Sequence, residues 1–205
     1  GLDAHRVDGT SFELGVFTNL SRDHLDYHSD MKDYARAKSI LFEQLIRPGG
    51  HAVVNATDPW MPAVLGSRRD LQVWRFGRPE DEVFLEVLER HSSGISARVH
   101  TPLGAAECFL NMVGDFNLLN ASAAIATGLA LGVDLADILS GLASLRGVRG
   151  RLEPVHSAQE HPSVYIDYAH TPAALQAAVA ALRLHTRGKL WVLFGCGGDR
   201  DRGKR

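Results

Sequence analysis

The sequence predicts an α/β fold built from two folding units. Near the N-terminus, an apolar run at residues 15–20 is followed by an amphipathic pattern that begins at Asp30 and by a second apolar run at residues 51–55. This order is typical of buried parallel strands joined by a helix. A second strand, helix and strand pattern follows Gly150. We therefore expect helical crossovers in both parts of the chain, an arrangement that defines the α/β class.

The first helix is expected to begin at Asp30, whose side chain can cap it, and to stop at the "RPGG" of residues 47–50. Its apolar residues recur every three or four positions, as an amphipathic helix requires: Met31, Tyr34, Leu41 and Leu45. The strand at residues 15–20 ends in a polar loop, and active-site groups of α/β sheets gather at the carboxyl ends of strands. This loop is therefore a candidate site.

The hydrophobic pattern changes in the middle of the chain. Residues 71–113 contain short, partly alternating segments separated by turn residues, which predicts an antiparallel meander. Two short helices are expected next, over residues 114–132 and 133–146. Gly132 can close the first, and Asp134 can cap the second.

The C-terminal pattern predicts a strand at residues 163–168, a helix at residues 171–185 and a strand at residues 189–195. Thr171 can cap this helix, and Pro172 suits its first turn because a missing N–H costs nothing there. Glycines and arginines without a period precede this pattern, so we expect a domain boundary near Gly150. The predicted domains are residues 1–149 and 150–205.

Composition limits the classes of function. The chain is 45% hydrophobic and 22% charged, which is ordinary for a globular protein, and its net charge of −2 offers no general attraction to nucleic acid or to an anionic membrane. No apolar run approaches the roughly 18 residues of a spanning helix, so we expect no membrane insertion. The two cysteines, Cys108 and Cys196, lie in unlike contexts, and no secretory signal is present. A cytoplasmic location is expected.

The two ends of the sequence differ from those of a complete chain. It opens at Gly1 without a methionine and stops within the polar segment "GCGGDRDRGKR". We therefore expect the chain to be a piece of a longer protein.

Lys38 interrupts the apolar face of the first predicted helix, because Tyr34, Lys38 and Leu41 are separated by four and three residues. One interpretation is that its methylene stem covers the core while the ammonium reaches water. The other is a functional lysine, which can lose its proton, react with carbon dioxide and become an anionic oxygen ligand for magnesium. His24, in the loop after the first strand, is either a polar capping group or an active-site residue.

Six motifs in one order decide between these interpretations: "TNLSRDHLDYH", "YARAK", "GDFNLLNASAA", "GRLE", "DYAHTPAAL" and "FGCGGDRDRGKR". Together they resemble the Mur ligase family over residues 1–205. The resemblance implies most of a central ATPase domain, with a mostly parallel sheet flanked by helices and a small antiparallel meander. The start of a Rossmann-like C-terminal domain would follow.

Members of this family form an amide by converting a carboxylate to an acyl phosphate with ATP, which the incoming amine then attacks. The motifs are most similar to the branch that adds meso-diaminopimelate or L-lysine to UDP-N-acetylmuramoyl-L-alanyl-D-glutamate in peptidoglycan synthesis. The resemblance implies ATP and Mg²⁺ as cofactors, with a UDP-N-acetylmuramoyl dipeptide and a diamino acid as substrates. It also implies that Lys38 is carbamylated and that Lys38 and His24 are catalytic metal ligands.

The resemblance assigns four nucleotide-binding residues. Asn117 resembles an asparagine that contacts adenine, although phenylalanine replaces the histidine that usually precedes it; otherwise it is a polar group at a helix N-terminus. Arg151 resembles an arginine that reaches the nucleotide, and its five donors suit phosphate oxygens; otherwise it is a solvated linker residue. Asp167 resembles an acid that contacts the ribose. His170 lies in the same turn, where it otherwise serves as a cap.

Two arginines resemble substrate-binding residues. Arg200 of "GCGGDRD" resembles an arginine that binds a carboxylate of the incoming amino acid. Arg6 resembles one that holds the UDP-linked peptide, although Ala4 stands where relatives often carry glutamine. A dinucleotide cradle at the glycine-rich segment is disfavoured because no helix N-terminus follows it in this sequence.

Two other functions remain open at the level of the sequence. One is a related ligase of the folylpolyglutamate or cyanophycin type, which "DYAHTP" and "GCGGDRD" disfavour. The other is a non-catalytic nucleotide-binding remnant, since no "GxxGK[ST]" phosphate loop occurs in the 205 residues. Because that loop holds the β- and γ-phosphates, we expect this chain by itself to be inactive.

Overall fold

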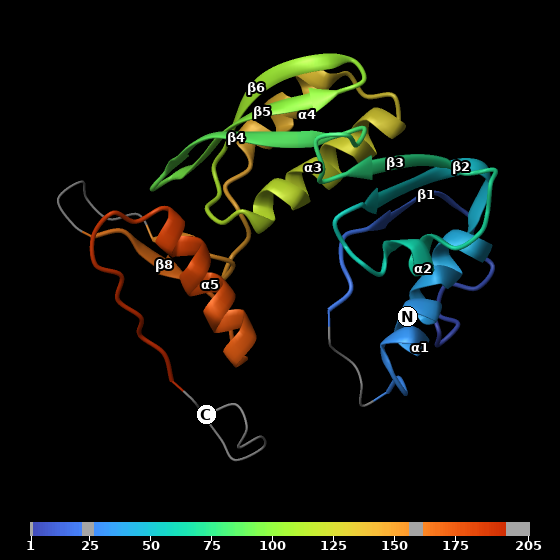
Figure 1. The fold of residues 1–205 in the computed structure, drawn as a ribbon, viewed down its shortest axis with the longest axis horizontal. Coiled ribbons are helices and arrows are strands. Elements are labelled where there is room, and N and C mark those ends of the chain that lie inside the picture. Colours follow the sequence, from blue (N-terminus) through green and yellow to red (C-terminus); the bar gives the residue numbers. More distant parts are fainter. Residues whose placement is uncertain (1, 22–26, 156–161, 196–205) are drawn as a thin grey trace. The chain divides into compact units, whose positions relative to one another are not determined.

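The structure is a computed structural model that describes residues 2–21, 27–155 and 162–195 (Figure 1). The chain divides into two compact units. The first contains Gly1–Leu85, Val99–Ala106 and Leu119–Leu139. The second contains Glu86–Arg98, Glu107–Leu118 and Ser140–Arg205.

The first unit is built on a three-stranded parallel sheet. Its strands are β1 (Phe12–Phe17), β2 (Ile46–Asn55) and β3 (Gln72–Phe76), in the order β1-β2-β3. Figure 1 shows helices α1 and α2 on the same side of this sheet. The consecutive residues Ala52, Val53 and Val54 are all fully buried. Because neighbouring strand residues point to opposite faces, both faces of the sheet are covered, as parallel sheets require.

The crossover between β1 and β2 is helical, as predicted. It consists of α1 (Met31–Ile40) followed by one π-helical turn (Leu41–Leu45). Asp30 is the N-cap of α1, and its side chain accepts a hydrogen bond from the Asp33 N–H at 2.8 Å. The helical segment ends at Leu45, and "RPGG" already belongs to β2, so the predicted stop was slightly late.

Arg68 determines how this helical segment ends. Its Nη1 donates to the carbonyls of Phe42 and Ile46 at 3.2 and 2.6 Å, and its guanidinium forms a bidentate pair with Asp70 at 2.9 and 2.5 Å. The last carbonyls of a helix have no partner within it. A side chain 22 or more residues away supplies the missing donors, which no local pattern around residue 46 could indicate.

The prediction that residues 71–113 form one meander was wrong for its first strand. β3 pairs in parallel with β2, from His51 and Gln72 to Asn55 and Phe76. The short helix α2 (Met61–Leu65) makes the crossover that a parallel pair needs. Partial alternation of apolar and polar residues does not distinguish an edge strand of a parallel sheet from a meander strand. In both kinds of strand, one face is more exposed to solvent than the other.

The remaining three strands form the predicted meander. They are β4 (Phe84–His91), β5 (Gly94–Thr101) and β6 (Gly104–Leu110), in the order β4-β5-β6. Two-residue connections join them, and turns this short connect only antiparallel strands. At Gly94 a Cβ atom would lie 2.1 Å from the Leu110 carbonyl oxygen. Only glycine fits this close approach of two backbones.

The two predicted helices after the meander are α3 (Phe116–Ala130) and α4 (Leu135–Ser144). Gly132 ends α3 with φ of 77°; its N–H donates to Leu129, and the Val133 N–H donates to Gly128. These two bonds form a Schellman motif, so the predicted role of Gly132 is confirmed. No helix among the described residues is long and apolar enough to cross a membrane.

The C-terminal part of the second unit contains β7 (Glu153–Val155), β8 (Val164–Ile166) and α5 (Pro172–Leu184). Thr171 caps α5 by accepting from the Ala174 N–H at 3.2 Å, as predicted. The predicted strand at residues 189–195 is absent from this described segment, so the expected strand–helix–strand unit does not form. β8 pairs instead with β7, antiparallel. An apolar run becomes a strand only when another strand pairs with it.

Candidate active site

The segments after β1 and β2 are fastened to each other at the carboxyl end of the parallel sheet. Asn55 is 3% exposed, and its Nδ2 donates to the Thr18 carbonyl at 2.7 Å. Asp58 accepts from the Leu20 N–H at 2.9 Å. These bonds fix residues 18–20, immediately before the polar loop, at the edge where the sequence placed a site.

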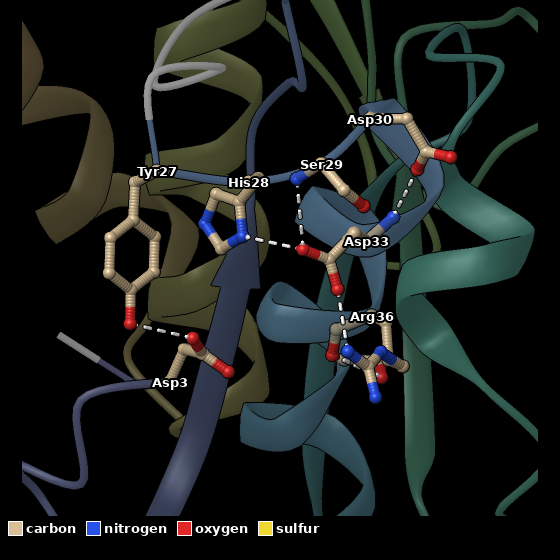
Figure 2. Close-up of polar contacts among 8 residues, drawn as sticks. Asp3, Tyr27, His28, Ser29, Asp30, Asp33 and Arg36 are labelled. Atoms are coloured by element: carbon tan, nitrogen blue, oxygen red, sulfur yellow. Dashed lines mark hydrogen bonds and ion pairs between the residues drawn. The ribbon is translucent and has the colours of Figure 1, made fainter.

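The entry to α1 is a network of charged capping groups, which Figure 2 shows. Asp33 lies at its centre. Its Oδ2 accepts from the Ser29 N–H and contacts His28 Nδ1, both at 3.3 Å, and its Oδ1 accepts from Arg36 at 2.5 Å. The Arg36 guanidinium, followed by the Ser29 N–H, lowers the pKa of the Asp33 carboxyl. Asp33 thus stays anionic at the positive end of the helix.

His28 is packed between two tyrosines. It is 8% exposed, its ring stacks on Tyr34 with centroids 4.9 Å apart, and the Tyr27 ring meets it edge-on at 4.8 Å. The Tyr27 hydroxyl donates to Asp3 at 2.9 Å, and this bond raises the pKa of Tyr27 (Figure 2). The start of the chain and the loop before α1 are therefore held side by side.

Lys38 lies in the last turn of α1, over the Tyr34 ring, with 5.2 Å from Nζ to the ring centroid. This geometry suits a cation–π contact. A cavity of about 310 Å³ opens beside it. The cavity is lined by Leu2, Asp3, Ala4, Arg6, Tyr27, His28, Tyr34, Ala37 and Lys38. The structure therefore brings together two of the sequence-predicted site residues, Arg6 and Lys38.

Asp3, Tyr27 and Tyr34 are among the cavity residues that were not predicted as site residues. Tyr34 could have been found, because it lies four positions before Lys38, and residues at this spacing are neighbours on a helix surface. Asp3 and Tyr27 are 24 positions apart and meet through a tertiary hydrogen bond. No sequence pattern signals that contact.

His24 and Arg200 lie outside the described residues. Within the described ranges, no three His, Cys, Asp or Glu side chains form a group that could hold a metal ion. A lysine ammonium has no lone pair for a metal ion, whereas a carbamate on Lys38 would offer anionic oxygens. Of the two predicted magnesium ligands, Lys38 and His24, only Lys38 lies among the described residues.

The second unit holds the four residues predicted to bind nucleotide. Arg151 lies in a tight turn in which its N–H donates to Val148 at 3.0 Å and the Gly150 N–H donates to Glu153 at 2.8 Å. Leu152, the next residue, has φ of 45° and is 3% exposed. A left-handed leucine is strained, and such strain persists only where surrounding contacts hold it.

Asp167 is the contact that holds this turn. Its Oδ2 accepts from the Leu152 N–H at 2.9 Å, and its Oδ1 accepts from the Ala169 N–H at 2.8 Å. The Tyr168 N–H donates to Gly150 at 2.8 Å, and the Arg151 guanidinium lies over the Tyr168 ring, 5.8 Å from its centroid. A carboxylate accepts about four hydrogen bonds, so Asp167 retains acceptor capacity for a ligand.

The other two predicted nucleotide residues are also oriented by backbone groups. His170 Nδ1 lies 3.0 Å from the Tyr168 carbonyl, which accepts only, so Nδ1 carries the proton. Asn117 donates from Nδ2 to the Val113 carbonyl at 2.9 Å, at the first turn of α3. The turn that carries Arg151, Asp167 and His170 is thus one hydrogen-bonded structure, and Asn117 belongs to the same unit.

Comparison with known proteins defines the class. Residues 1–128 match the Mur ligase middle domain, and residues 150–205 match the Mur ligase, glutamate ligase domain. The chain belongs to the Mur ligase family. The predicted division into residues 1–149 and 150–205 stays a prediction, because the two compact units are interleaved along the sequence.

Comparison with individual relatives shows which members of the family this chain is similar to. The chain is 47% identical to the UDP-N-acetylmuramoyl-L-alanyl-D-glutamate--2,6-diaminopimelate ligase of Alkalilimnicola ehrlichii and 45% identical to that of Gloeobacter violaceus, over 100% of this chain and 41% of each relative. A solved structure of a ligase with this name is 31% identical, with a TM-score of 0.79 over 100% of this chain and 42% of that one. The chain spans about two fifths of the length of these relatives.

Proposed function

We propose that the chain is part of an ATP-dependent amide ligase that acts in cytoplasmic peptidoglycan precursor synthesis. Its substrates would be UDP-N-acetylmuramoyl-L-alanyl-D-glutamate and meso-diaminopimelate or L-lysine. The observation that carries the proposal is the cavity shared by Arg6 and Lys38, in a chain whose relatives bear this ligase name. Arg6 would bind an anionic substrate there, and Lys38 would be carbamylated.

The proposed reaction has two steps. A carboxylate oxygen of the UDP-linked dipeptide attacks the γ-phosphorus of ATP, which gives an acyl phosphate and ADP. The amine of the diamino acid then attacks the acyl carbon, inorganic phosphate leaves with the electrons of the C–O bond, and the amine loses a proton. Magnesium, when bound, neutralises phosphate charge. Lys38 as a carbamate, with His24, would hold it.

The remaining residues would bind and orient the reactants. Asn117 would contact adenine and Asp167 the ribose, through the acceptor capacity left by its two backbone bonds. Arg151 would reach phosphate oxygens from its place over the Tyr168 ring, with His170 in the adjoining turn. The hydrogen bonds that hold these residues to backbone groups support these roles, because a side chain that is already ordered loses less entropy when a ligand binds.

Arg6 and Arg200 would bind the two organic substrates. Arg6 is exposed and lines the cavity, where its planar guanidinium can pair with a carboxylate or a phosphate. Arg200 would bind a carboxylate of the diamino acid, as the family resemblance implies.

Lys38 provides the test, in the longer ligase chain in which we expect this sequence to occur. Lys38→Ala should lose most activity, and acetate or formate should restore part of it by occupying the vacated volume. Rescue would be incomplete, because a free anion must be ordered at an entropic cost that a tethered group avoids. Lys38→Arg should remain inactive with either anion, since its side chain fills the space and keeps a positive charge.

Lys32→Ala is the matched control, because Lys32 is exposed on the same helix and should keep full activity. The measurement is ADP formation that depends on both organic substrates. Full activity of Lys38→Arg would refute the carbamate and return Lys38 to a packing role. Wild-type nucleotide binding without any amide product would instead support a non-catalytic nucleotide-binding protein.

A further inference from the structure

The last residue of the α5 segment, His185, reaches two distant parts of the second unit. It is the C-cap of α5, and its ring lies against the end of β4 and the segment before α3. Nδ1 is 2.7 Å from the His91 carbonyl oxygen, and Nε2 is 3.1 Å from the Gly114 backbone nitrogen. One imidazole therefore links three segments of the chain.

The partners fix the tautomer of this imidazole. A carbonyl oxygen only accepts, so Nδ1 must carry the proton and donate to His91. A backbone N–H only donates, so Nε2 must be unprotonated and accept from Gly114. A neutral imidazole offers one donor and one acceptor, and both are used here. His185 is thus a matched connector between two backbone groups of opposite type.

The Gly114 end of this link leads directly to Asn117. Gly114 is buried with φ of 93°, and a Cβ there would lie 2.7 Å from the Phe116 ring. Its carbonyl accepts from the Asn117 N–H at 2.9 Å, while the preceding carbonyl, that of Val113, accepts from the Asn117 side chain at 2.9 Å. Both the backbone and the side chain of Asn117 are therefore set by residues 113 and 114.

Apolar packing supports the same connection. Val113, Leu152 and Ala181 form one buried cluster, in which Tyr165, Ala178 and Leu182 also pack. Ala181 precedes His185 by four residues, so the two share one face of the α5 segment. On that face, Ala181 packs in the cluster with Val113. One turn later, the ring of His185 lies against Gly114.

We propose that His185 is a positioning residue for Asn117: its neutral imidazole ties the end of α5 to residues 113–114 and so places Asn117 for nucleotide. The role of Asn117 rests on the proposed function. The tie, meaning the two hydrogen bonds of His185 to His91 and Gly114, does not. α5 thereby connects the segment that carries Asn117 to the part of the chain that carries Arg151 and Asp167.

Tyr165 supplies a matched control. Its hydroxyl donates to the Ser92 carbonyl, next to His91, so Tyr165→Phe removes a hydrogen bond to the same β4–β5 turn without touching Gly114. His185→Phe removes both imidazole bonds. His185→Gln keeps a donor and an acceptor on one terminal amide and should restore both.

The first measurement is hydrogen exchange of the Gly114 and Asn117 amides in the 205-residue chain. His185→Phe should raise the Gly114 exchange rate by about fivefold, the effect of one lost hydrogen bond, with a smaller rise at Asn117. His185→Gln and Tyr165→Phe should exchange at the wild-type rate at Gly114. Equal Gly114 rates in wild type and His185→Phe would overturn the tie.

The second measurement is the dissociation constant of MgATP for wild type and the same three variants of the longer ligase chain, because the 205 residues contain no phosphate loop. His185→Phe should weaken binding by about fivefold, His185→Gln should restore it, and Tyr165→Phe should leave it unchanged. Equal weakening by His185→Phe and Tyr165→Phe would reduce His185 to a structural role and overturn the positioning proposal. If the longer wild-type chain binds no MgATP, the nucleotide function and the positioning role fail together, while hydrogen exchange at Gly114 still tests the hydrogen bonds of His185.

Discussion

Two parts of the sequence carry the same strand–helix–strand pattern, and only one becomes that structure. In the first unit, β1, α1 and β2 form, and Ala52, Val53 and Val54 are completely buried. In the second, α5 forms, but the apolar segment after it forms no strand, and Leu193 is 101% exposed. The local patterns are alike, so the difference lies in the partners.

The comparison shows what a strand needs beyond its own residues. β2 has a strand on each side, β1 and β3, and its ladder satisfies backbone groups in both directions. Residues 189–195 pair with no strand in the described part of the chain. Helices differ because their hydrogen bonds are internal, so α5 forms with its cap and one apolar face whether or not a sheet is complete.

The largest expected effect is a difference in the stability cost of truncating two large apolar side chains, Phe42 and Leu193. Phe42 is 1% exposed in the first core, whereas Leu193 is fully exposed. Phe42→Ala should lower the free energy of unfolding of the first unit by about 4 kcal/mol through lost burial and a cavity. Leu193 lies in the second unit, and Leu193→Ala should change the free energy of unfolding of that unit by less than about 0.5 kcal/mol.

Urea unfolding followed by tryptophan fluorescence checks this prediction. In a Trp191→Phe background the other two tryptophans, Trp60 and Trp74, both report on the first unit and so measure the cost of Phe42→Ala. Hydrogen exchange of the α5 amides in the otherwise wild-type chain measures the cost of Leu193→Ala in the second unit. A Leu193→Ala cost as large as that of Phe42→Ala would contradict the exposure of residues 189–195.

The second effect concerns the end of the helical segment before β2. Arg68→Ala removes the donors to the Phe42 and Ile46 carbonyls and should destabilise the first unit by about 2 kcal/mol. Arg69→Ala is the control, because Arg69 is the exposed neighbour of Arg68. Thermal unfolding of both variants checks it. Equal melting temperatures would mean that water replaces the guanidinium without loss.

A smaller effect compares the two capped helices. Asp30→Ala and Thr171→Ala each remove a side-chain acceptor at a helix N-terminus, worth about 1 kcal/mol. Hydrogen exchange should therefore accelerate at the Asp33 amide in the first variant and at the Ala174 amide in the second. Each variant is the control for the other. Acceleration at both amides in either variant would show that the two helices unfold together.

The smallest effect is a pH dependence in the first unit. The Arg68 guanidinium lowers the pKa of Asp70 to about 2. A carboxylate with a depressed folded-state pKa adds stability above its unfolded pKa, near 3.9, and loses that contribution as pH falls toward the folded value. The melting-temperature advantage of wild type over Asp70→Asn should therefore shrink between about pH 4 and pH 2. A constant difference in melting temperature across this pH range would contradict a stabilising Arg68–Asp70 ion pair.

Part of the candidate site could be predicted from residues alone. Lys38 was found because it interrupts an apolar spacing, and Asp30 and Thr171 because caps have a local signature. The motifs identified the Mur ligase family, which the family matches confirmed. The roles of the individual site residues stay predictions. The Tyr27–Asp3 bond and the Leu152–Asp167 bond could not be predicted, because each joins residues more than ten positions apart.

The sequence by itself determined the properties that depend on near neighbours: the positions of α1, α3, α4 and α5, the caps of α1 and α5, the glycine end of α3 and the order of motifs. Tertiary structure decided which apolar runs became strands, assigned β3 to the parallel sheet rather than to the meander, and brought Arg6 to the same cavity as Lys38. The reason is the range of the interactions. Capping and helical hydrogen bonds close within about four residues, whereas strand pairing and cavities join segments whose meeting only the whole fold selects.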